Sequence, residues 1–280
     1  MLVLGLTGWP VNHSLSPVLH KAALRAVGID GDYLLLPIDP SEPSKLIDLL
    51  NKVRSGEISG LNVTIPHKQS VIQLVDQLTP SASSIGAVNT IYMKDGQLVG
   101  HNTDAPGFLA DLKQKNIIDF HSKKRVIVLG SGGSARAIVW ALAALSSRIT
   151  IASRKIEQSR KLGAEFNQEF TGCEIRSTTI GVSALSVKLD NVDLVVNTTP
   201  VGMFPDTNYS PWPVGLPFPA NAFVYDLVYN PRQTNLVENA RKAGLAAENG
   251  LGMLIEQAAL AFEIWTGVKA PRDVMYSSVG

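Results

Sequence analysis

The sequence predicts an α/β protein that folds as two domains. Its 280 residues suit about two domains of ordinary size. Short β-type runs alternate with helical patterns along almost the whole chain, which is typical of mainly parallel sheets covered by helices. The polar, turn-rich stretch GHNTDAPG, residues 100–107, interrupts this alternation before a second α/β pattern begins. We therefore place a first, open α/β domain at residues 1–105 and a second domain at residues 106–250.

The composition indicates a globular protein without a strongly charged partner. Hydrophobic residues make up 45% of the chain and charged residues 18%, which suits a sizeable core. The formal net charge of +1 gives no reason to expect nucleic acid or an acidic membrane as a partner. No apolar run reaches the roughly 18 residues that a membrane helix needs. The single cysteine, Cys173, excludes an intrachain disulfide, so we expect a cytoplasmic protein.

The first domain is expected to contain five strands and three helices. Apolar β-type runs predict strands over 2–6, 33–38, 61–65, 90–93 and 98–99. Helical patterns predict helices over 17–27, 44–54 and 70–77. Ser16 is a good N-cap for the first of these helices. Asp95-Gly96 predicts a hairpin between the last two strands, because both central residues of a type I′ turn need positive φ.

The second domain repeats the alternation of strands and helices. Strands are predicted over 126–129, 149–152, 194–196 and 223–226. Helices are predicted over 108–115, 134–146 and 235–243, and a last helix over 253–265 follows this domain. The proline-rich stretch 201–220 shows no periodicity, so we expect an irregular loop there.

A glycine loop follows the first strand of the second domain and indicates a Rossmann-type dinucleotide site. The run VIVLGSGGSA fits the pattern G-x-G-x-x-A. Its first glycine permits a tight turn, its second lets the backbone approach a pyrophosphate, and its small third residue lets helix and strand pack closely. The start of the next helix offers free N–H groups to the phosphates. The cofactor-binding candidates are Gly130, Ser131, Gly132, Gly133, Ser134 and Ala135.

The end of the next strand indicates which dinucleotide binds. NAD sites usually carry an acid roughly 20 residues after the glycine loop, to bind the ribose 2′-hydroxyl. Here the strand runs into Ser153, Arg154 and Lys155, with no acid. An arginine pairs with phosphate whereas a carboxylate would repel it. The sequence therefore favours NADP (NADPH) over NAD, although a solvated helix start would carry the same two cations. The five scattered histidines and the one cysteine predict no metal site.

Polar side chains in the first domain follow the ends of predicted strands. These side chains carry hydroxyl, amide or carboxylate groups. They occur as two i, i+2 pairs and two single residues, namely Ser14 with Ser16, Asn62 with Thr64, Asn89 and Asp104. An i, i+2 pair in an extended segment points both side chains the same way. Such groups at the carboxyl ends of strands suit a small polyhydroxylated acid. Lys68 follows one of these strands, and by itself it would be interpreted as an ordinary solvated lysine.

Several ordered motifs make the whole chain resemble the shikimate dehydrogenase family, whose members reduce 3-dehydroshikimate to shikimate with NADPH. These motifs are GWPVNHSLSP, NVTIPHK, GAVNT, NTDA, GSGGSA and NGLGMLIEQAA. The resemblance implies that a C-terminal segment, about residues 251–280, returns to complete the N-terminal substrate-binding domain. It also implies that the second domain is the Rossmann-type NADP-binding domain. Dimers are common in the family, so the resemblance allows a homodimer.

The resemblance also implies roles for individual residues. Lys68 and Asp104 resemble the catalytic pair, and Ser14 with Ser16 resembles the pair that holds the substrate carboxylate. Partners of the substrate hydroxyls are implied at Thr64, Asn89 and Asp104, with Asn62 nearby. Tyr229 and Gln257 match positions that close over the substrate. Cofactor contacts are implied at Ser153, Arg154, Lys155, Thr198, Leu227 and Gly250.

The chemistry of ketone reduction is consistent with a functional Lys68. An ammonium group can polarise the carbonyl and donate the proton that its oxygen needs. Asp104 would orient that lysine, but a carboxylate neighbour favours the charged lysine, so the formal base of the pair stays open. His67 stands where many relatives have Phe, and we expect it on the outer side. Other departures are Ala105, Ser153 and Lys155, where Gly, Asn and Thr are frequent. The alternatives are a quinate/shikimate dehydrogenase that uses NAD and a non-catalytic dinucleotide-binding regulator.

Overall fold

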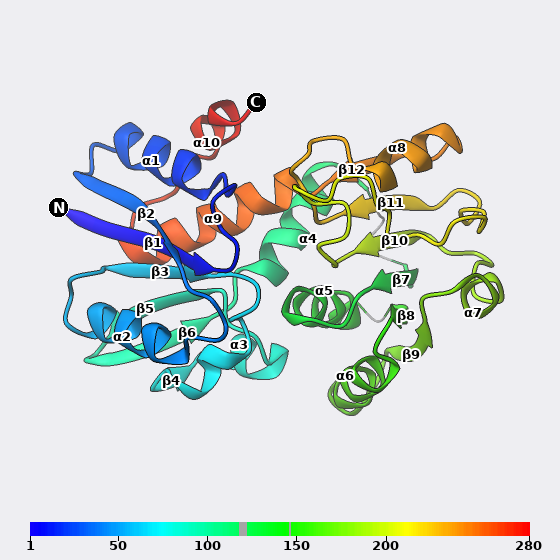
Figure 1. Ribbon diagram of the computed structural model, residues 1–280, viewed down its shortest axis with the longest axis horizontal. Coiled ribbons are helices and arrows are strands. Elements are labelled where there is room, and N and C mark those ends of the chain that lie inside the picture. The colour runs from blue at the N-terminus through cyan, green and yellow to red at the C-terminus, as the bar shows by residue number, and fades with distance from the viewer. Residues whose placement is uncertain (118–121, 146) are drawn as a thin grey trace. The chain divides into compact units, whose positions relative to one another are not determined.

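The computed structural model describes residues 1–117, 122–145 and 147–280 (Figure 1). The chain divides into two compact units. Unit 1 comprises residues 1–107 together with 254–280, and unit 2 comprises residues 108–253. Each unit has a six-stranded sheet of its own.

The sheet of unit 1 is mixed. Its strands are β1 (Leu2–Gly8), β2 (Gly31–Pro37), β3 (Gly60–Val63), β4 (Gln77–Leu78), β5 (Thr90–Lys94) and β6 (Gln97–His101). They lie in the order β2-β1-β3-β5-β6-β4. β1 pairs in parallel with both β2 and β3, whereas β5 runs antiparallel to β3 and β6. The predicted hairpin is present between β5 and β6, and its turn residues Asp95 and Gly96 have φ values of 51° and 77°.

Helices of unit 1 bury an apolar side against the sheet or one another. They are α1 (Ser16–Ala26), α2 (Pro43–Arg54), α3 (Pro80–Ile85), α9 (Leu251–Thr266) and α10 (Arg272–Ser278). In α2 the buried side consists of Leu46, Leu49, Leu50 and Val53. The indole N–H of Trp265 in α9 donates to the carbonyl of Ile91 in β5 at 3.1 Å. This bond fixes α9 against the middle of the sheet.

Three expectations for unit 1 were wrong in detail. The helix predicted over 70–77 is only a short 3-10 turn, Ser70–Gln73, followed by strand β4. Ser16 is not an N-cap, because α1 begins at Ser16 itself and Leu15 precedes it without a side-chain cap. Unit 1 ends at residue 107, the last of the polar stretch 100–107, but this stretch is not irregular throughout, since β6 extends to His101 and α4 (Asp104–Gln114) starts three residues later.

The sheet of unit 2 is wholly parallel. Its strands are β7 (Arg125–Leu129), β8 (Arg148–Ser153), β9 (Glu174–Thr179), β10 (Leu194–Asn197), β11 (Phe223–Asp226) and β12 (Ala247–Asn249). Their order is β12-β11-β10-β7-β8-β9. Counted along the chain this is the 3-2-1-4-5-6 order of dinucleotide-binding sheets. The glycine loop leaves β7, where the strand order reverses.

Helices α4, α5 (Gly133–Ala144), α6 (Ile156–Glu169), α7 (Val182–Ser186) and α8 (Asn235–Lys242) accompany this sheet. The predicted helices 134–146 and 235–243 correspond to α5 and α8, although residue 146 lies outside the described residues. α6, α7, β9 and β12 were not predicted, nor were α3 and α10 in unit 1. No helix or strand occurs between β10 and β11, as the proline-rich sequence predicted. None of the described helices is long and apolar enough to cross a membrane.

Candidate active site

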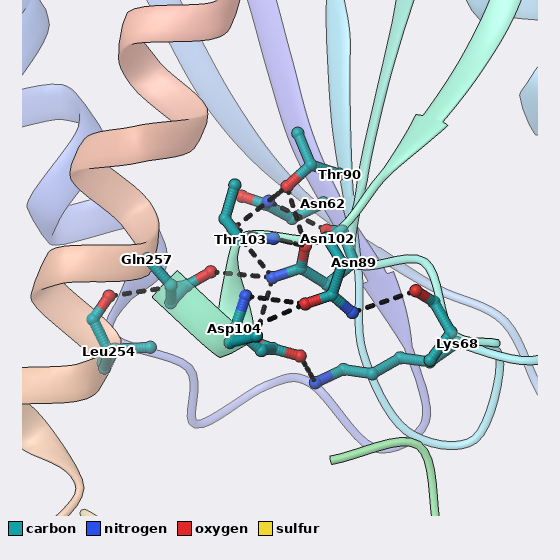
Figure 2. Close-up of polar contacts among 11 residues, drawn as sticks. Asn62, Lys68, Asn89, Thr90, Asn102, Thr103, Asp104, Leu254 and Gln257 are labelled. Carbon is teal, nitrogen blue, oxygen red and sulfur yellow. Dashed lines mark hydrogen bonds and ion pairs between the residues drawn. The ribbon is translucent and has the colours of Figure 1, made fainter. Parts of the chain in front are cut away.

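A buried ion pair lies in unit 1 (Figure 2). Lys68, in the loop after β3, places its Nζ 2.7 Å from Oδ2 of Asp104, the first residue of α4. The side chains are only 10% and 6% exposed. Taking two charges out of water costs desolvation free energy, and only close pairing and further hydrogen bonds offset that cost. We call Lys68 and Asp104 the buried ion pair.

The start of α4 is built to hold Asp104. The side-chain oxygen of Asn102 accepts hydrogen bonds from the backbone N–H groups of Asp104 and Ala105, at 3.0 and 3.2 Å. This is the role of an N-cap residue. The first turn of a helix carries a partial positive charge, which attracts the side chain placed there. Asn102 was missed in the sequence, although an Asn just before a helix is a recognisable capping signal.

Asn89 connects Asp104 to the helix that returns from the C-terminus. Its Nδ2 donates to Oδ1 of Asp104 at 2.9 Å and lies 3.3 Å from Oε1 of Gln257 in α9. Gln257 is itself held, because its Nε2 donates to the Leu254 carbonyl at 2.8 Å. A Cβ at Gly107 would come 2.8 Å from Cβ of Gln257, so only glycine lets α9 approach α4 this closely. Residues far apart in sequence therefore meet at Asp104.

The side-chain amide of Asn62 lies next to Asn89, and both ends of the amide are hydrogen-bonded to other protein groups. Its Oδ1 accepts from the Tyr33 hydroxyl at 2.8 Å, and its Nδ2 donates to the Asn89 carbonyl at 3.0 Å. The same Nδ2 lies 3.3 Å from Oγ1 of Thr90. Tyr33 and Thr90 were not among the sequence candidates, because neither belongs to a pattern that marks a polar site.

The remaining candidates of unit 1 lie at the start of α1 and in the loop after β3. The hydroxyls of Ser14 and Ser16 are 3.1 Å apart, although Leu15 between them is in the αR region and not in the extended conformation that we expected. Thr64 follows β3 and is half-buried. His67 is not on the outer side as we expected. It is 5% exposed, and its Nε2 lies 2.8 Å from the Ile38 carbonyl, so its ring is used in packing.

In unit 2 the glycine loop has the form that close approach to a ligand requires. Gly130 has a φ of 112°, and a Cβ there would come 2.5 Å from Oγ1 of Thr198. That hydroxyl donates to the Leu129 carbonyl at 2.7 Å, which fastens the loop to the end of β10. A Cβ at Gly132 would instead meet open space at the start of α5. Ser131, Gly133 and Ser134 are half-buried around it, and Ala135 is buried.

The end of β8 carries cations and no acid. Arg154 and Lys155 are exposed, and the Ser153 hydroxyl donates to the Lys155 carbonyl at 2.9 Å. This arrangement and the open cradle at Gly132 suit a dinucleotide with a 2′-phosphate. Among the described residues no group of three or more His, Cys, Asp or Glu is placed to hold a metal ion.

The last candidates are Leu227 and Tyr229 in the loop after β11 and Gly250, which follows β12. Gly250 packs its backbone against the carbonyl of Leu227, and a side chain at Gly250 would overlap that carbonyl. Tyr229 is half-buried in the same loop. Asp226, which sequence reasoning missed, accepts from the Val228 N–H at 3.0 Å and so fixes the start of the loop. Burial raises the pKa of Asp226 to about 6, and hydrogen bonds from its neighbours only partly oppose this.

Together, the 3-2-1-4-5-6 sheet with its glycine loop and the buried lysine–aspartate pair among amides define a dinucleotide-dependent oxidoreductase. Family models match residues 6–91 as "Shikimate dehydrogenase substrate binding domain" and residues 250–279 as "Shikimate 5'-dehydrogenase C-terminal domain". The "Shikimate dehydrogenase (NADP(+))" of Methanopyrus kandleri is 41% identical over 99% of this chain and 94% of its own length. The chain therefore belongs to the shikimate dehydrogenase family.

Solved structures agree with this placement. The enzyme of Thermus thermophilus, in complex with NADP(H) and shikimate, has a TM-score of 0.84 and 35% identity over 99% of this chain and 98% of that one. The enzyme of Listeria monocytogenes, in complex with shikimate and NAD, has a TM-score of 0.86 and 32% identity over 100% of this chain and 96% of that one. The two neighbours hold different dinucleotides, so the cofactor preference of this chain depends on its own residues.

Proposed function

We propose that this protein catalyses the reversible reduction of 3-dehydroshikimate to shikimate with NADPH. The observation that carries the proposal is the buried ion pair, because stability alone gives little reason to keep two charges out of water. The relatives of similar length bear the name of this activity. In this proposal residues 1–105, completed by about 251–280, bind the substrate, and residues 106–250 bind the dinucleotide. Shikimate and 3-dehydroshikimate are the small-molecule partners, and the cytoplasm is the proposed compartment.

The proton is the part of the reaction that this chain must supply. NADPH, when bound, supplies the hydride that reaches the carbonyl carbon. The ammonium of Lys68 donates a proton to the carbonyl oxygen, which becomes the hydroxyl of shikimate, and Lys68 is left neutral. In the oxidative direction neutral Lys68 takes that proton back. Asp104 orients Lys68 through their 2.7 Å contact and accepts from a neighbouring substrate hydroxyl.

The other polar groups of unit 1 bind the substrate in this proposal. Ser14 and Ser16 donate to its carboxylate from adjacent hydroxyls. Thr64 and Asn89 contact its ring hydroxyls. Asn62 is assigned to the support of Asn89, because both ends of its amide are already bonded within the protein. Gln257 and Tyr229 are assigned as further substrate contacts, as the family resemblance implies.

The cofactor contacts follow from unit 2. The backbone of the loop from Gly130 to Ala135 would hold the pyrophosphate, since Gly132 faces open space there. Arg154 would pair with the 2′-phosphate, with Ser153 and Lys155 beside it. Thr198, Leu227 and Gly250 are assigned to the nicotinamide half. The expected contact of Arg154 with the 2′-phosphate makes NADPH the preferred dinucleotide.

The direct test mixes purified protein with 3-dehydroshikimate and either NADPH or NADH, and follows nicotinamide absorbance. We expect fast oxidation of NADPH and much slower oxidation of NADH. Faster oxidation of NADH would contradict the role of Arg154 while keeping the reaction. Quinate with NADP⁺ or NAD⁺ tests the broader specificity. Folded protein that oxidises neither cofactor would overturn the proposal in favour of a non-catalytic regulator.

A further inference from the structure

A line of buried polar side chains leads from β2 to the buried ion pair, wholly within unit 1. The Tyr33 hydroxyl donates to Oδ1 of Asn62 at 2.8 Å, and Nδ2 of Asn62 donates to Oγ1 of Thr90 at 3.3 Å. The Thr90 hydroxyl donates to Oδ1 of Asn89 at 3.0 Å. These four side chains are at most 5% exposed, so bulk water cannot replace a missing partner. Most of this line is visible in Figure 2.

The direction of every bond in this line follows from its last member. A carboxylate only accepts, so Asn89 must turn its Nδ2 toward Oδ1 of Asp104. Its Oδ1 then faces the Thr90 hydroxyl and the Thr103 N–H, which must both donate. A hydroxyl has one hydrogen, so Thr90 can only accept from the next group, Asn62. Oδ1 of Asn62 is left to face Tyr33, whose hydroxyl must donate.

We propose that Tyr33 is a positioning residue for the reaction. Its hydroxyl donates to Oδ1 of Asn62, whose Nδ2 in turn donates to the backbone carbonyl of Asn89 at 3.0 Å and to Oγ1 of Thr90. Without the Tyr33 hydroxyl, Oδ1 of Asn62 would be a buried acceptor that has lost its donor, and Asn62 would shift. A shift of Asn62 would displace Asn89, whose Nδ2 donates to Oδ1 of Asp104, and so disturb the carboxylate that orients Lys68. The effect on turnover rests on the proposed function, whereas the hydrogen-bond direction does not.

The surroundings of Tyr33 hold its ring in place. The ring of His20 in α1 stacks on it with centroids 4.4 Å apart and planes inclined by 2°. Burial lowers the pKa of His20 to about 3, which the nearby Asn62 side chain only partly opposes, so His20 is neutral near pH 7. Neither ring nitrogen of His20 has a hydrogen-bond partner in the described chain. His20 therefore contributes packing and no charge, and the Tyr33 hydroxyl is the polar end of this stack.

The test is Tyr33→Phe, which removes the hydroxyl and retains the stacked ring. Loss of one buried hydrogen bond of this kind should lower kcat about three- to tenfold while KM changes less than about twofold. A second readout needs no activity. In ¹⁵N NMR spectra the side-chain amide signals of Asn62 and Asn89 should shift and exchange faster with solvent. The amide of Asn197, buried in unit 2 and bonded to Asp226 at 2.8 Å, should be unchanged.

Matched variants separate positioning from general loss of stability. Tyr225→Phe also removes a buried tyrosine hydroxyl, which bonds Oδ2 of Asp111 in unit 2 at 2.6 Å, and it should lower Tm without lowering kcat. Thr90→Val cuts the chain at its middle and Thr90→Ser restores the hydroxyl, so only the first should lower kcat. The effects of Tyr33→Phe and Thr90→Val on kcat should not add, because both break one chain.

Three results would overturn the inference. One is a Tyr33→Phe protein with normal kcat and unchanged Asn89 amide signals. Another is full additivity of Tyr33→Phe with Thr90→Val. The third is equal loss of kcat in Thr90→Val and Thr90→Ser, which also decides the matter if Tyr33→Phe does not fold. A wild-type protein without activity on 3-dehydroshikimate would instead overturn the proposed function, and the amide signals would still test the chain.

Discussion

Two lysine–aspartate pairs in unit 1 have nearly the same length and opposite surroundings. Lys21 lies 2.6 Å from Asp32, with side chains 40% and 44% exposed, whereas the buried ion pair is at most 10% exposed at 2.7 Å. An exposed pair contributes under about 1 kcal/mol. Burying a charge costs several kcal/mol per ion, which the attraction between partners often only balances. The N···O distance therefore does not distinguish the two pairs. Burial does distinguish them, and it marks Lys68 and Asp104 as the pair for which a function is the better explanation.

Replacement of Lys68 by Ala tests this assignment. We expect kcat to fall by about 10²–10⁴-fold, because the proton donor is lost, with a smaller change in KM. Lys21→Ala is the matched control, since it removes a lysine from an equally short but exposed pair and should leave kcat within about twofold. Steady-state kinetics with 3-dehydroshikimate measure both variants. Near-normal turnover of Lys68→Ala would show that this lysine does not move the proton.

Replacement of Arg154 by Asp tests the cofactor assignment. A carboxylate would repel the 2′-phosphate that the guanidinium is expected to bind, so NADPH affinity should fall about 10- to 100-fold. NADH has no such phosphate and should lose much less affinity. Arg160→Asp alters an exposed arginine further along α6, which pairs with Glu157, and serves as the control. Fluorescence titration of the wild type and both variants with NADPH and with NADH gives six dissociation constants. Equal losses for both dinucleotides in Arg154→Asp would refute the phosphate contact.

For individual residues, the sequence predicted contacts between neighbours within a short motif. It did not predict contacts between residues that are far apart in the chain. Ser14 and Ser16 are two positions apart, and their hydroxyls meet, although at the start of α1 and not in the extended segment that we expected. Asn89 and Gln257 are 168 positions apart, so only the family resemblance could suggest that they belong to one site. Tyr33 could not be found in this way, because an apolar strand with one tyrosine is ordinary.

At the scale of elements, Gly130 and Gly132 in the loop between β7 and α5 are required for different reasons. Gly130 needs its positive φ and has Thr198 within 2.5 Å of a Cβ, whereas Gly132 has an ordinary φ of −85° and open space. Gly130→Ala should therefore lower Tm. Gly132→Ala should keep Tm but weaken NADPH binding about tenfold or more, because its methyl group would occupy the space where the phosphates approach. Calorimetry and NADPH titration of both variants measure the contrast. A large loss of Tm in Gly132→Ala would contradict it.

The predicted and missed elements differ in how much of their surface is buried. β7 and β10 are buried strands with continuous apolar runs, and both were predicted. β9 lies at the edge of its sheet and buries only Ile175 among six mostly polar residues, so no pattern marks it. α6 has no side-chain cap and buries the small residues Ser159 and Gly163 beside Leu162 and Phe166. Weakly apolar edges of a fold are recognisable only once the sheet beside them is known.

At the scale of the whole molecule, the two units carry buried titratable groups with opposite effects of pH on stability. In unit 1 burial lowers the pKa of His20 from 6.5 to about 3 and also lowers that of His101. The unfolded chain then binds more protons than the folded one between these values, so stability rises with pH. In unit 2 burial raises the pKa of Asp226 from 3.8 to about 6 and also raises that of Asp111. There the folded form binds more protons, and stability falls as pH rises through this window.

Between pH 4 and pH 6, the free energy of unfolding should therefore rise with pH for unit 1 and fall with pH for unit 2. The full effect is up to roughly 5 kcal/mol for His20 and roughly 3 kcal/mol for Asp226, and part of each lies inside the window. We expect the urea midpoint of peptides from unit 1 to rise with pH and that of peptides from unit 2 to fall. Pulsed hydrogen exchange at one fixed pulse pH, read by mass spectrometry, gives both midpoints. His20→Gln should flatten the response of unit 1 alone and Asp226→Asn that of unit 2 alone, because each substitution removes one titration. Parallel responses that neither variant changes would show that other groups control the stability of both units.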